Sequence, residues 1–404
     1  MTRPRLAFVA LHAYPLFFPR ESGGIFGGTE VRAWRFACEL ARRNAFDISF
    51  IVMDHGQPEQ HVNGVRVVPH QGYPALVNHT ASTPSRLRTR IPPFVGTAIR
   101  KLRFRGDPWR ARAFPAWDAY AAADADVYCV FGVSDVAADV VRYCKQARRI
   151  SALFVGSDEE LSATYRAGSL ESNVYGSLNG LCHYSIVNGD AVIVQTDAQK
   201  KMAASRFGRD SRIVRNPVEL GEQPPSGAGR YVAWIGKSDS VKRPELLIEV
   251  ARRLPNIEFK MILNASDAQA HRSIHAIAPR NVTTIMDQAT IEQSRQFISS
   301  AALLVNTSRF EGFANAMLEA CAAGVPVVTL AVDPEGFIAA SGSGESAGGN
   351  FDRFVAAIEA LMTDSARRAH LGENAKRYVE TRHEVGARAA ELEEVFFDLL
   401  GGRK

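Results

Sequence analysis

The sequence predicts an α/β protein with two doubly wound domains, each built on a parallel sheet with helices on both faces. Three observations predict this fold class. Apolar runs typical of strands alternate with helical patterns, the alternation starts again at Tyr231, and a stretch rich in Gly, Pro and Ser separates the two series. The length of 404 residues agrees with two or three domains of about 150 residues each.

The first series begins with an apolar run, Leu6–Leu11, which we interpret as a buried strand. A signal peptide is the alternative, but His12 and Pro15 interrupt the apolar run and no small-residue cleavage site follows. The other elements expected in this series are a helix over Val31–Arg43 and strands over Asp47–Met53, Asp126–Phe131 and Ala191–Gln195.

The second series repeats this pattern. Pro244 opens its first helix, which continues over Glu245–Leu254, because a proline at the first helical position loses no hydrogen bond. The expected strands are Tyr231–Ile235, Glu258–Leu263, Leu303–Asn306 and Val325–Leu330, and the other expected helices are Thr290–Ser300, Ala316–Ala323 and a charged amphipathic tail over 372–400. Asn216-Pro217 and residues 221–229 mark the linker between the two domains.

The composition is that of an ordinary globular protein. The chain carries 48 Lys and Arg against 43 Asp and Glu, a formal net charge of +5, with 46% apolar residues, which excludes a disordered, collagen-like or coiled-coil chain. The five cysteines form no Cys-x-x-Cys pair, so we expect neither a disulfide scaffold nor a cysteine zinc site. No apolar run approaches the roughly 20 residues of a membrane span. We therefore expect a cytoplasmic protein.

Glycines gather between the first strand and the first helix. They form the pairs Gly23-Gly24 and Gly27-Gly28, followed by Glu30. Glycine lets a backbone approach a ligand closely, and the N-terminus of the following helix offers N–H groups to an anion. A plain flexible loop is the alternative, since the pattern is neither Gly-x-Gly-x-x-Gly nor a P-loop.

Two lysines, Lys237 and Lys242, follow the first strand of the second domain. Sheets of this kind bind ligands outside the carboxyl ends of their strands. Two ammonium groups there suit a diphosphate, whose charge would otherwise lose its hydration without compensation. Two solvated loop lysines are the alternative interpretation.

Two glutamates form the third candidate feature. Glu311 follows a strand, and Glu319 lies eight residues later on the next helix. Carboxylates accept hydrogen bonds from the vicinal hydroxyls of a sugar or a ribose. A solvated helix face is the alternative, but Glu319 stands among Leu318, Ala320 and Cys321, so it is either buried with a partner or lines a pocket.

This last segment, Glu311-Gly-Phe…Leu318-Glu319-Ala…Gly324-Val-Pro-Val-Val, resembles the E-x7-E signature of the family 4 retaining glycosyltransferases, which have the GT-B fold. The resemblance covers almost the whole chain. Gly27-Gly28-Thr29-Glu30 is similar to the first glycine loop of that family, and Gly236-Lys237…Lys242 is similar to its Gly-Arg…Lys-Gly phosphate loop.

The resemblance implies two Rossmann-like domains that face each other across a cleft. Residues 1–218 would bind the acceptor, and residues 219–384 would bind the nucleotide sugar. A C-terminal helix over about 385–404 would pack back on the first domain.

The resemblance also implies roles for single residues. Glu319 would hold the ribose hydroxyls, and Glu311 would contact the transferred sugar near the reacting carbon. The backbone N–H groups that would hold the sugar and the phosphate belong to Phe313, Ala314 and Asn315.

The phosphates would be held from two sides. Lys237 and Lys242 would neutralise the diphosphate as it leaves, the step at which charge develops. Gly27 and Gly28 would close over it, and the base would lie near residues 286–288.

Members of this family retain the sugar's configuration by a same-face route in which the leaving phosphate accepts the acceptor's proton. Such a route requires no metal, and no Asp-x-Asp motif is placed to hold a diphosphate, so we expect no metal or other cofactor. Glu311 is not assumed to be a covalent nucleophile, so the two-carboxylate logic of glycosidases does not apply.

The sequence departs from the family at two candidate positions. Lys237 stands where the family usually has arginine, which keeps the charge but loses the bidentate fork. Many members have a histidine near the sugar, and Asp158 takes part of that place in our interpretation. A helix cap formed by Ser157 or Asp158 is the alternative. The catalytic candidates are therefore Glu311 and Asp158.

A basic stretch, residues 86–112, interleaves nine arginines and lysines with aromatic and aliphatic residues. One interpretation is peripheral contact with an anionic membrane surface at the inner membrane face, or a grip on an anionic, lipid-linked acceptor. The other is a solvated insertion packed on its own domain. Nucleic acid is not expected as a partner, because no recognised binding motif accompanies the charge.

We therefore expect a metal-independent, retaining glycosyltransferase. Its donor would be a nucleoside-diphosphate sugar, with UDP placed before GDP, and its acceptor a polysaccharide, a glycolipid or another glycan. The alternatives are a sugar-nucleotide epimerase or a phosphorylase on the same fold, or a sugar-nucleotide-binding protein without turnover.

Overall fold

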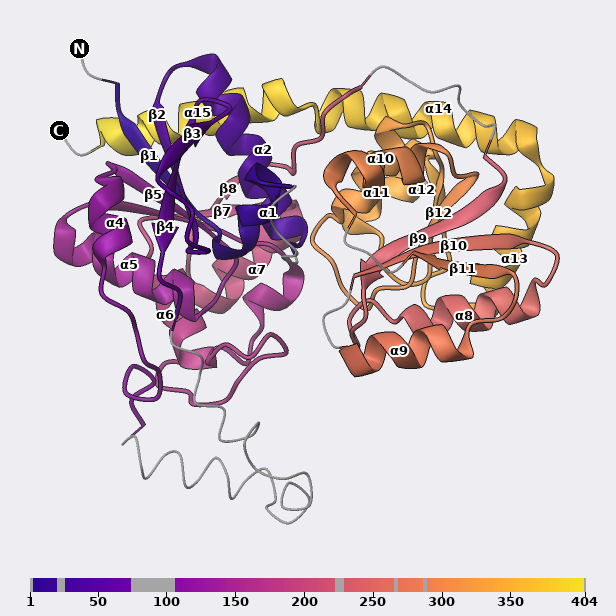
Figure 1. The fold of residues 1–404 in the computed structure, drawn as a ribbon, viewed down its shortest axis with the longest axis horizontal. Helices are drawn as coiled ribbons and strands as arrows, with labels where there is room; N and C mark the ends of the chain where they lie inside the picture. The colour runs from indigo at the N-terminus through magenta and orange to yellow at the C-terminus, as the bar shows by residue number, and fades with distance from the viewer. Residues whose placement is uncertain are drawn as a thin grey trace. The chain divides into compact units, whose positions relative to one another are not determined.

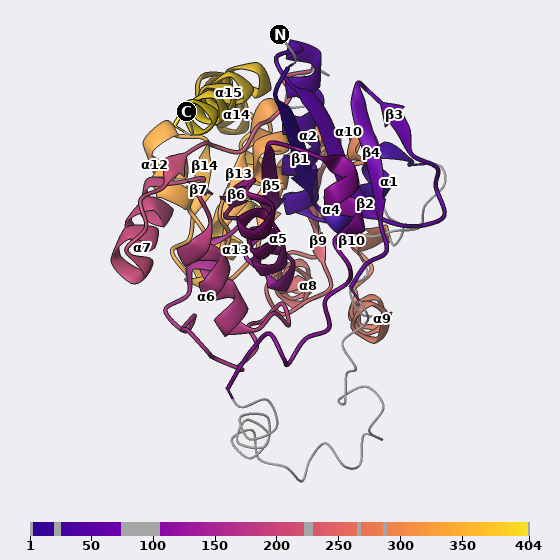
Figure 2. The same ribbon diagram turned by 90° about the vertical axis from the view of Figure 1, so that its left-hand side faces the viewer.

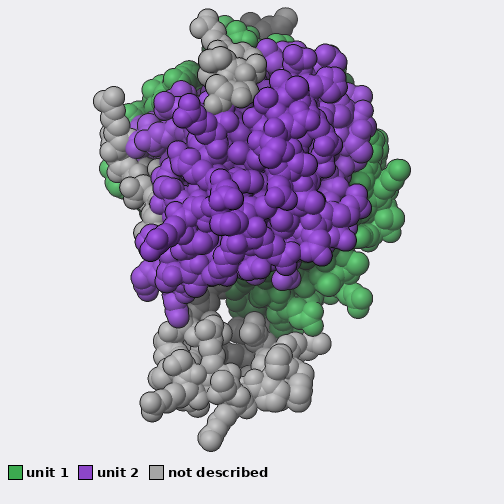
Figure 3. All heavy atoms as spheres, turned by 90° about the vertical axis from the view of Figure 1, so that its right-hand side faces the viewer, with its two compact units in different colours: residues 1–11, 40–213, 393–404 green, residues 12–39, 214–392 purple. Residues whose placement is uncertain are grey.

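The computed structural model describes residues 3–19, 26–73, 106–221, 229–264, 268–285 and 289–402. The chain forms two compact units, which are coloured separately in Figure 3. Unit 1 comprises residues 1–11, 40–213 and 393–404, and unit 2 comprises residues 12–39 and 214–392. Each unit is thus assembled from separate stretches of the chain, and helices α2 (Gly28–Arg43) and α15 (Val385–Gly401) contribute residues to both.

In the described part of unit 1, an eight-stranded sheet has the order β3-β4-β2-β1-β5-β6-β7-β8. Its neighbours are parallel, apart from the antiparallel pair β3 and β4. The strands are β1 (Arg5–Val9), β2 (Asp47–Met53), β3 (Gln60–Val62), β4 (Val65–His70), β5 (Val127–Phe131), β6 (Ile150–Phe154), β7 (Ala191–Val194) and β8 (Arg212–Ile213). The chain goes from β1 outward to β2 and later returns to β5 on the other side of β1.

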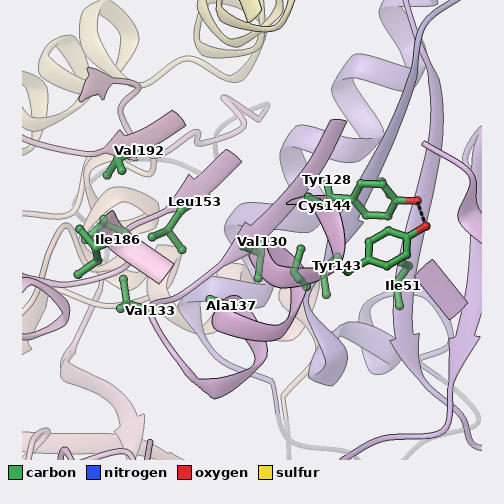
Figure 4. Close-up of a cluster of buried hydrophobic side chains, with 14 of the residues drawn as sticks. Ile51, Tyr128, Val130, Val133, Ala137, Tyr143, Cys144, Leu153, Ile186 and Val192 are labelled. Carbon is green, nitrogen blue, oxygen red and sulfur yellow. Dashed lines mark hydrogen bonds between the residues drawn. The ribbon is translucent and has the colours of Figure 1, made fainter. Parts of the chain in front are cut away.

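Side chains on the two faces of this sheet belong to separate layers. On one face, Tyr128, Val130 and Leu153 join a buried cluster with helix α5 (Asp135–Ala147), which Figure 4 shows. On the other face, phenylalanine rings form a row across four strands, with successive centroids 6.0, 5.7 and 4.1 Å apart, in the order Phe50, Phe8, Phe131 and Phe154. Strands with both faces buried read as continuous apolar runs, which is the pattern that predicted them.

Helices α5 and α7 (Asp197–Phe207) of unit 1 start at polar caps. Ser134 accepts a hydrogen bond from the Ala137 N–H at the start of α5, and Thr196 does the same for the Gln199 N–H at the start of α7. Helix α5 packs on β5 and β6, and Figure 2 shows α6 (Asn179–Asn188) beside α5. The other helices in the described part of this unit are α4 (Asp118–Ala123), the 3-10 turn η2 (Asp158–Leu161), α6 (Asn179–Asn188) and α7 (Asp197–Phe207).

The final residues of α15 also pack on unit 1. The ring of Phe396 meets that of Phe46 edge-on, with centroids 5.9 Å apart. Arg43 forms an ion pair with Glu393 at 2.7 Å.

The described part of unit 2 holds a six-stranded parallel sheet in the order β11-β10-β9-β12-β13-β14. The strands are β9 (Tyr231–Lys237), β10 (Glu258–Asn264), β11 (Val282–Ile285), β12 (Leu303–Asn306), β13 (Val327–Thr329) and β14 (Gly344–Ser346). The prediction of two parallel-sheet α/β domains is therefore confirmed.

Alternation along the strands of unit 2 again produces two cores. Val232 and Trp234 of β9 pack with helices α8 and α13, while Ala233 between them packs with α10, α11 and α14. Figure 1 shows α8 and α9 together on one side of this sheet. Besides α2 and α15, the helices of the unit are η1 (Leu11–Ala13), α1 (Tyr14–Phe17), α8 (Pro244–Arg253), α9 (Ala268–Ile277), α10 (Ile291–Ser299), α11 (Asn315–Ala322), η3 (Pro334–Gly336), α12 (Phe337–Ser341), α13 (Phe351–Thr363) and α14 (Ser365–Arg382). None of the described helices is both long enough and apolar enough to cross a membrane.

Several predicted elements differ from the structure at their ends, and the following three are among them. The first strand ends at Val9 rather than Leu11, because a 3-10 turn begins there. The strand expected over Val325–Leu330 is shortened to β13, although its apolar neighbours remain buried. The helical tail breaks at His383, so that α14 and α15 are separate helices.

His383 is fully buried at this break. Its Nδ1–H donates to the backbone oxygen of Asn216 at 2.8 Å, and its ring packs against Phe313 with centroids 4.6 Å apart. Burial lowers the pKa of His383 from 6.5 to about 3, and the neighbouring cations Arg215, Arg388 and Arg382 act in the same direction.

The buried neutral histidine predicts a pH-dependent stability. Between pH 6.5 and about 3 the unfolded chain binds a proton at His383 that the folded chain does not, so the free energy of unfolding falls as the pH falls. The loss should reach about 2 kcal/mol between pH 7 and pH 5. We expect the melting temperature of wild type to drop more over this interval than that of His383→Gln. His275→Gln, at an exposed position of the same unit, should behave like wild type, and equal drops in all three proteins would refute the assignment.

Candidate functional site

The strand order of unit 2 reverses between β9 and β12. These two strands are neighbours, but the chain continues from β9 to β10 on one side and from β12 to β13 on the other. Ligands of open parallel sheets bind in the crevice that such a reversal leaves at the carboxyl ends of the strands. The loops that leave β9 and β12 there are residues 238–243 and 307–314, and they contain several of the predicted site residues.

Lys242 and Glu311 come together across this reversal. The Lys242 ammonium forms an ion pair with Oε1 of Glu311, and the hydroxyl of Ser308 donates to the same oxygen at 2.7 Å. Their side chains are 26% and 12% exposed, so the pair is reachable from solvent but largely enclosed. A cation and a carboxylate held this closely can contact charged and hydroxyl groups of one ligand.

Glu319 is on the second turn of α11, where two arginines hold it. Arg35 of α2 pairs with Oε1, and Nε of Arg295 in α10 lies 3.2 Å from Oε2. Arg295 also pairs with Glu219 at 2.8 Å. The Glu319 side chain is only 10% exposed and that of Arg35 1%. A carboxylate has about four lone-pair positions, and these two contacts use one on each oxygen.

Burial and the nearby Arg295 lower the pKa of Arg35 to about 9, against the opposing effect of Glu219. Since this value is above neutral pH, Arg35 stays protonated there. The carboxylate of Glu319 therefore faces a charged guanidinium, which stabilises its ionised form.

The two predicted glycines, Gly27 and Gly28, start helix α2. The Gly27 N–H donates to the Glu30 carboxylate at 2.8 Å, and the side-chain amide of Asn315 donates to the Gly28 oxygen at 2.8 Å. A Cβ atom at Gly27 would lie 3.3 Å from the Lys237 ammonium nitrogen. The structure thus brings this glycine pair beside Lys237 and Asn315, while Gly23 and Gly24 lie outside the described residues.

Phe313, Ala314 and Asn315 form the approach to α11. Ala314 is the N-cap residue and has no side chain that could bond the first N–H groups. The amide of Asn216 donates to the Phe313 oxygen at 2.8 Å, which fixes this approach against the buried segment that ends at Val218. The start of α11 therefore presents backbone dipoles toward the same strand reversal.

Asp158 belongs to unit 1, whereas the other predicted site residues belong to unit 2. It is the first residue of η2, which begins after the three-residue connection that follows β6, and its Oδ1 accepts a hydrogen bond from the Gln199 amide at 3.0 Å. Burial raises the pKa of Asp158, which the Gln199 hydrogen bond and Arg206 oppose. The alternative role as a helix cap finds no support, since the Ser157 cap position makes no side-chain hydrogen bond to η2.

Sequence reasoning missed the arginines around Glu319. Arg35 follows Val31 by four residues and so lies on the apolar face of the predicted helix, where a charge signals a buried partner. Arg295 carries no such signal. In the described part of the chain, no three or more His, Cys, Asp or Glu residues gather as a metal ion would require.

Two predictions fall wholly or mostly outside the described residues. Residues 286–288, expected near the base, are outside them, and so are residues 86–105 of the basic stretch. The described end of that stretch packs on unit 1, because Arg112 pairs with Asp135 at 2.6 Å and Trp109 packs against Tyr184 with centroids 5.0 Å apart. Membrane contact stays a prediction.

The chain resembles known proteins in fold and in one sequence region. Its fold is similar to that of sucrose-phosphate synthase from Thermosynechococcus elongatus, with a TM-score of 0.73 and 16% identity over 99% of this chain and 100% of that one. The fold is also similar to that of HepE from Anabaena, solved with UDP and glucose, with a TM-score of 0.65 and 14% identity over 98% of this chain and 99% of that one. For WaaG, a glycosyltransferase involved in lipopolysaccharide biosynthesis, the TM-score is 0.60 and the identity 13% over 96% of this chain and 99% of that one.

These structural neighbours are GT-B glycosyltransferases, so the predicted GT-B fold is confirmed. A comparison with curated protein sequences gives no match. The family model described as Glycosyl transferases group 1 matches residues 221–378, which contain the loops after β9 and β12 and helix α11. This match supports sugar transfer as the chemistry of the candidate site.

Proposed function

We propose that the protein is a retaining glycosyltransferase that uses a nucleoside-diphosphate sugar. The observation that carries the proposal is the pairing of Lys242 with Glu311 at the strand reversal of unit 2, inside the region that matches the glycosyltransferase family model. A cation for the diphosphate and a carboxylate for sugar hydroxyls are there held side by side.

The donor would lie along the carboxyl ends of β9 and β12. Lys237 and Lys242 would neutralise the diphosphate, with Gly27 and Gly28 close enough to cover it. Glu319 would accept the ribose hydroxyls through the lone pairs that Arg35 and Arg295 leave. Both arginines hold the carboxylate in one place, so little side-chain freedom is lost when the nucleotide binds.

The sugar would lie between Glu311 and the start of α11. Glu311 would orient the sugar hydroxyls, and the N–H groups of Phe313, Ala314 and Asn315 would bind the sugar and the phosphate. UDP is the first candidate nucleotide and GDP the second. HepE, which has the same fold, was solved with UDP and glucose, and that supports the order.

Transfer would proceed on one face of the sugar. The bond from the anomeric carbon to the diphosphate oxygen breaks, the bond to the acceptor oxygen forms, and the acceptor's proton passes to the departing phosphate. The two ammonium groups stabilise the charge that develops on the diphosphate, which is where preorganised charge contributes most to the rate. This route requires no metal ion.

The acceptor would bind to unit 1 and would be a polysaccharide, a glycolipid or another glycan. Asp158 is the proposed acceptor-side residue, because it stands at the carboxyl end of β6 and has a raised pKa. The basic stretch would hold an anionic, lipid-linked acceptor or an inner membrane surface.

A thermal-shift screen over UDP-, GDP-, ADP- and TDP-linked sugars tests the proposal, because a ligand that binds the folded state raises the melting temperature. We expect a rise with one nucleotide series. Product analysis with the selected donor then separates transfer, which needs an acceptor, from epimerisation, which needs none, and from phosphorolysis, which needs free phosphate. A protein that responds to no nucleotide sugar would refute the proposal.

Glu319→Gln should weaken nucleotide binding about tenfold, which is ~1.4 kcal/mol. The amide keeps the shape of the side chain but loses the charge that the ribose hydroxyls would meet. Calorimetry with UDP and GDP measures the change. Glu292→Gln, at an exposed position of α10, is the matched control and should bind like wild type. Unaltered nucleotide affinity in Glu319→Gln would contradict the ribose assignment.

Glu311→Gln should lower kcat by about 100-fold while changing nucleotide affinity by less than about threefold. The reason is that Glu311 would contact the transferred sugar near the reacting carbon and not the nucleotide. Steady-state kinetics with the donor from the screen give kcat, and calorimetry gives the affinity. A variant that loses nucleotide binding but keeps kcat would show that the two glutamates have the opposite roles.

A further inference from the structure

Arg243 follows Lys242 at a position where the backbone favours glycine. Its φ is +52°, in the left-handed region that side chains with a Cβ rarely adopt. The helix that begins at Pro244 would therefore start more easily from glycine, and the arginine must be explained by what its side chain does.

The Arg243 side chain reaches across the strand reversal to the loop after β12. Its Nε donates to the Thr307 oxygen at 2.6 Å, and its second guanidinium nitrogen donates to the Ser308 oxygen at 3.1 Å. The side chain is half-buried, and this burial lowers its pKa, with a further contribution from Arg309. One planar group thus binds two consecutive carbonyls of the neighbouring loop.

Two hydrogen bonds run in the opposite direction. The Thr307 hydroxyl donates to the Lys242 oxygen at 2.6 Å, and the Arg309 N–H donates to the Val241 oxygen at 2.9 Å. Together with the two Arg243 bonds they join the backbones on both sides of the Lys242–Glu311 ion pair. Arg243 binds the backbone oxygen of Ser308, and the hydroxyl of the same residue donates to Glu311.

We propose that Arg243 is a positioning residue that clamps the loop after β9 to the loop after β12, and so holds the Lys242 ammonium beside Glu311 and toward the diphosphate. The inference rests on the proposed function, since it assigns Lys242 to the phosphate farther from the nucleoside. Arg243 itself touches no substrate in this arrangement. Together with the hydrogen bonds from Thr307 and Arg309, the clamp would give the two loops one fixed geometry before the donor binds.

The variant R243G tests the clamp, because it removes the guanidinium and relieves the backbone strain, so that the fold should survive. Hydrogen exchange of the peptide over residues 303–317 should become about tenfold faster at the amides of 307–311. R243K keeps the positive charge but loses the two-pronged guanidinium, so its exchange rate at these amides should lie between those of wild type and R243G. R280G, at an exposed turn arginine of the same unit, should exchange like wild type. Unchanged exchange in R243G would overturn the clamp.

A second measurement separates positioning from general loosening. Calorimetry with UDP and UMP, or with GDP and GMP, reports what the second phosphate adds to affinity. R243G should lower the ratio of diphosphate to monophosphate affinity about tenfold, whereas a loosened site would weaken both ligands alike and leave the ratio unchanged, which would overturn the proposal. If wild type bound none of these nucleotides, the proposed function would fail, and hydrogen exchange would still decide whether Arg243 joins the loops.

Discussion

Glu311 and Glu319 each form ion pairs with cations from other parts of the chain. The packing of unit 2 around the candidate site depends on these ion pairs. A largely buried carboxylate is costly unless it is paired and hydrogen-bonded. Arg35 and Arg295 provide the pairing for Glu319, and Arg35 also donates to the Pro217 oxygen at 3.0 Å. Because Arg35 is part of α2, the need to neutralise Glu319 fixes the stretch 12–39 against the rest of the unit.

The sequence predicted the sheets well and the partners of charged residues poorly. Strands β2 and β12 have the bounds that their apolar runs predicted. Such runs are typical of strands that are buried on both faces, although β1 and β13 end inside theirs. Arg35 and Glu319, by contrast, are 284 residues apart. Nothing local in either helix identifies the other, so this pair needed a three-dimensional structure.

The candidate site shows the same division. Lys242 and Glu311 were predicted from their places after two strands, and the structure joins them, although their roles stay predictions. The sequence analysis did not identify Arg243. Its left-handed backbone angle and its hydrogen bonds to two carbonyls of another loop are not visible in a pattern of residue types.

The division of the chain between the two units has a consequence for how the protein is made. Unit 1 includes residues 393–404, and Phe46 and Arg43 find their partners Phe396 and Glu393 only there. A ribosome delivers residues 393–404 after all the described strands of both sheets, so unit 1 cannot be completed until these residues emerge. Before residues 393–404 emerge, the ring of Phe46 lacks its contact with Phe396, and this favours early association with a chaperone.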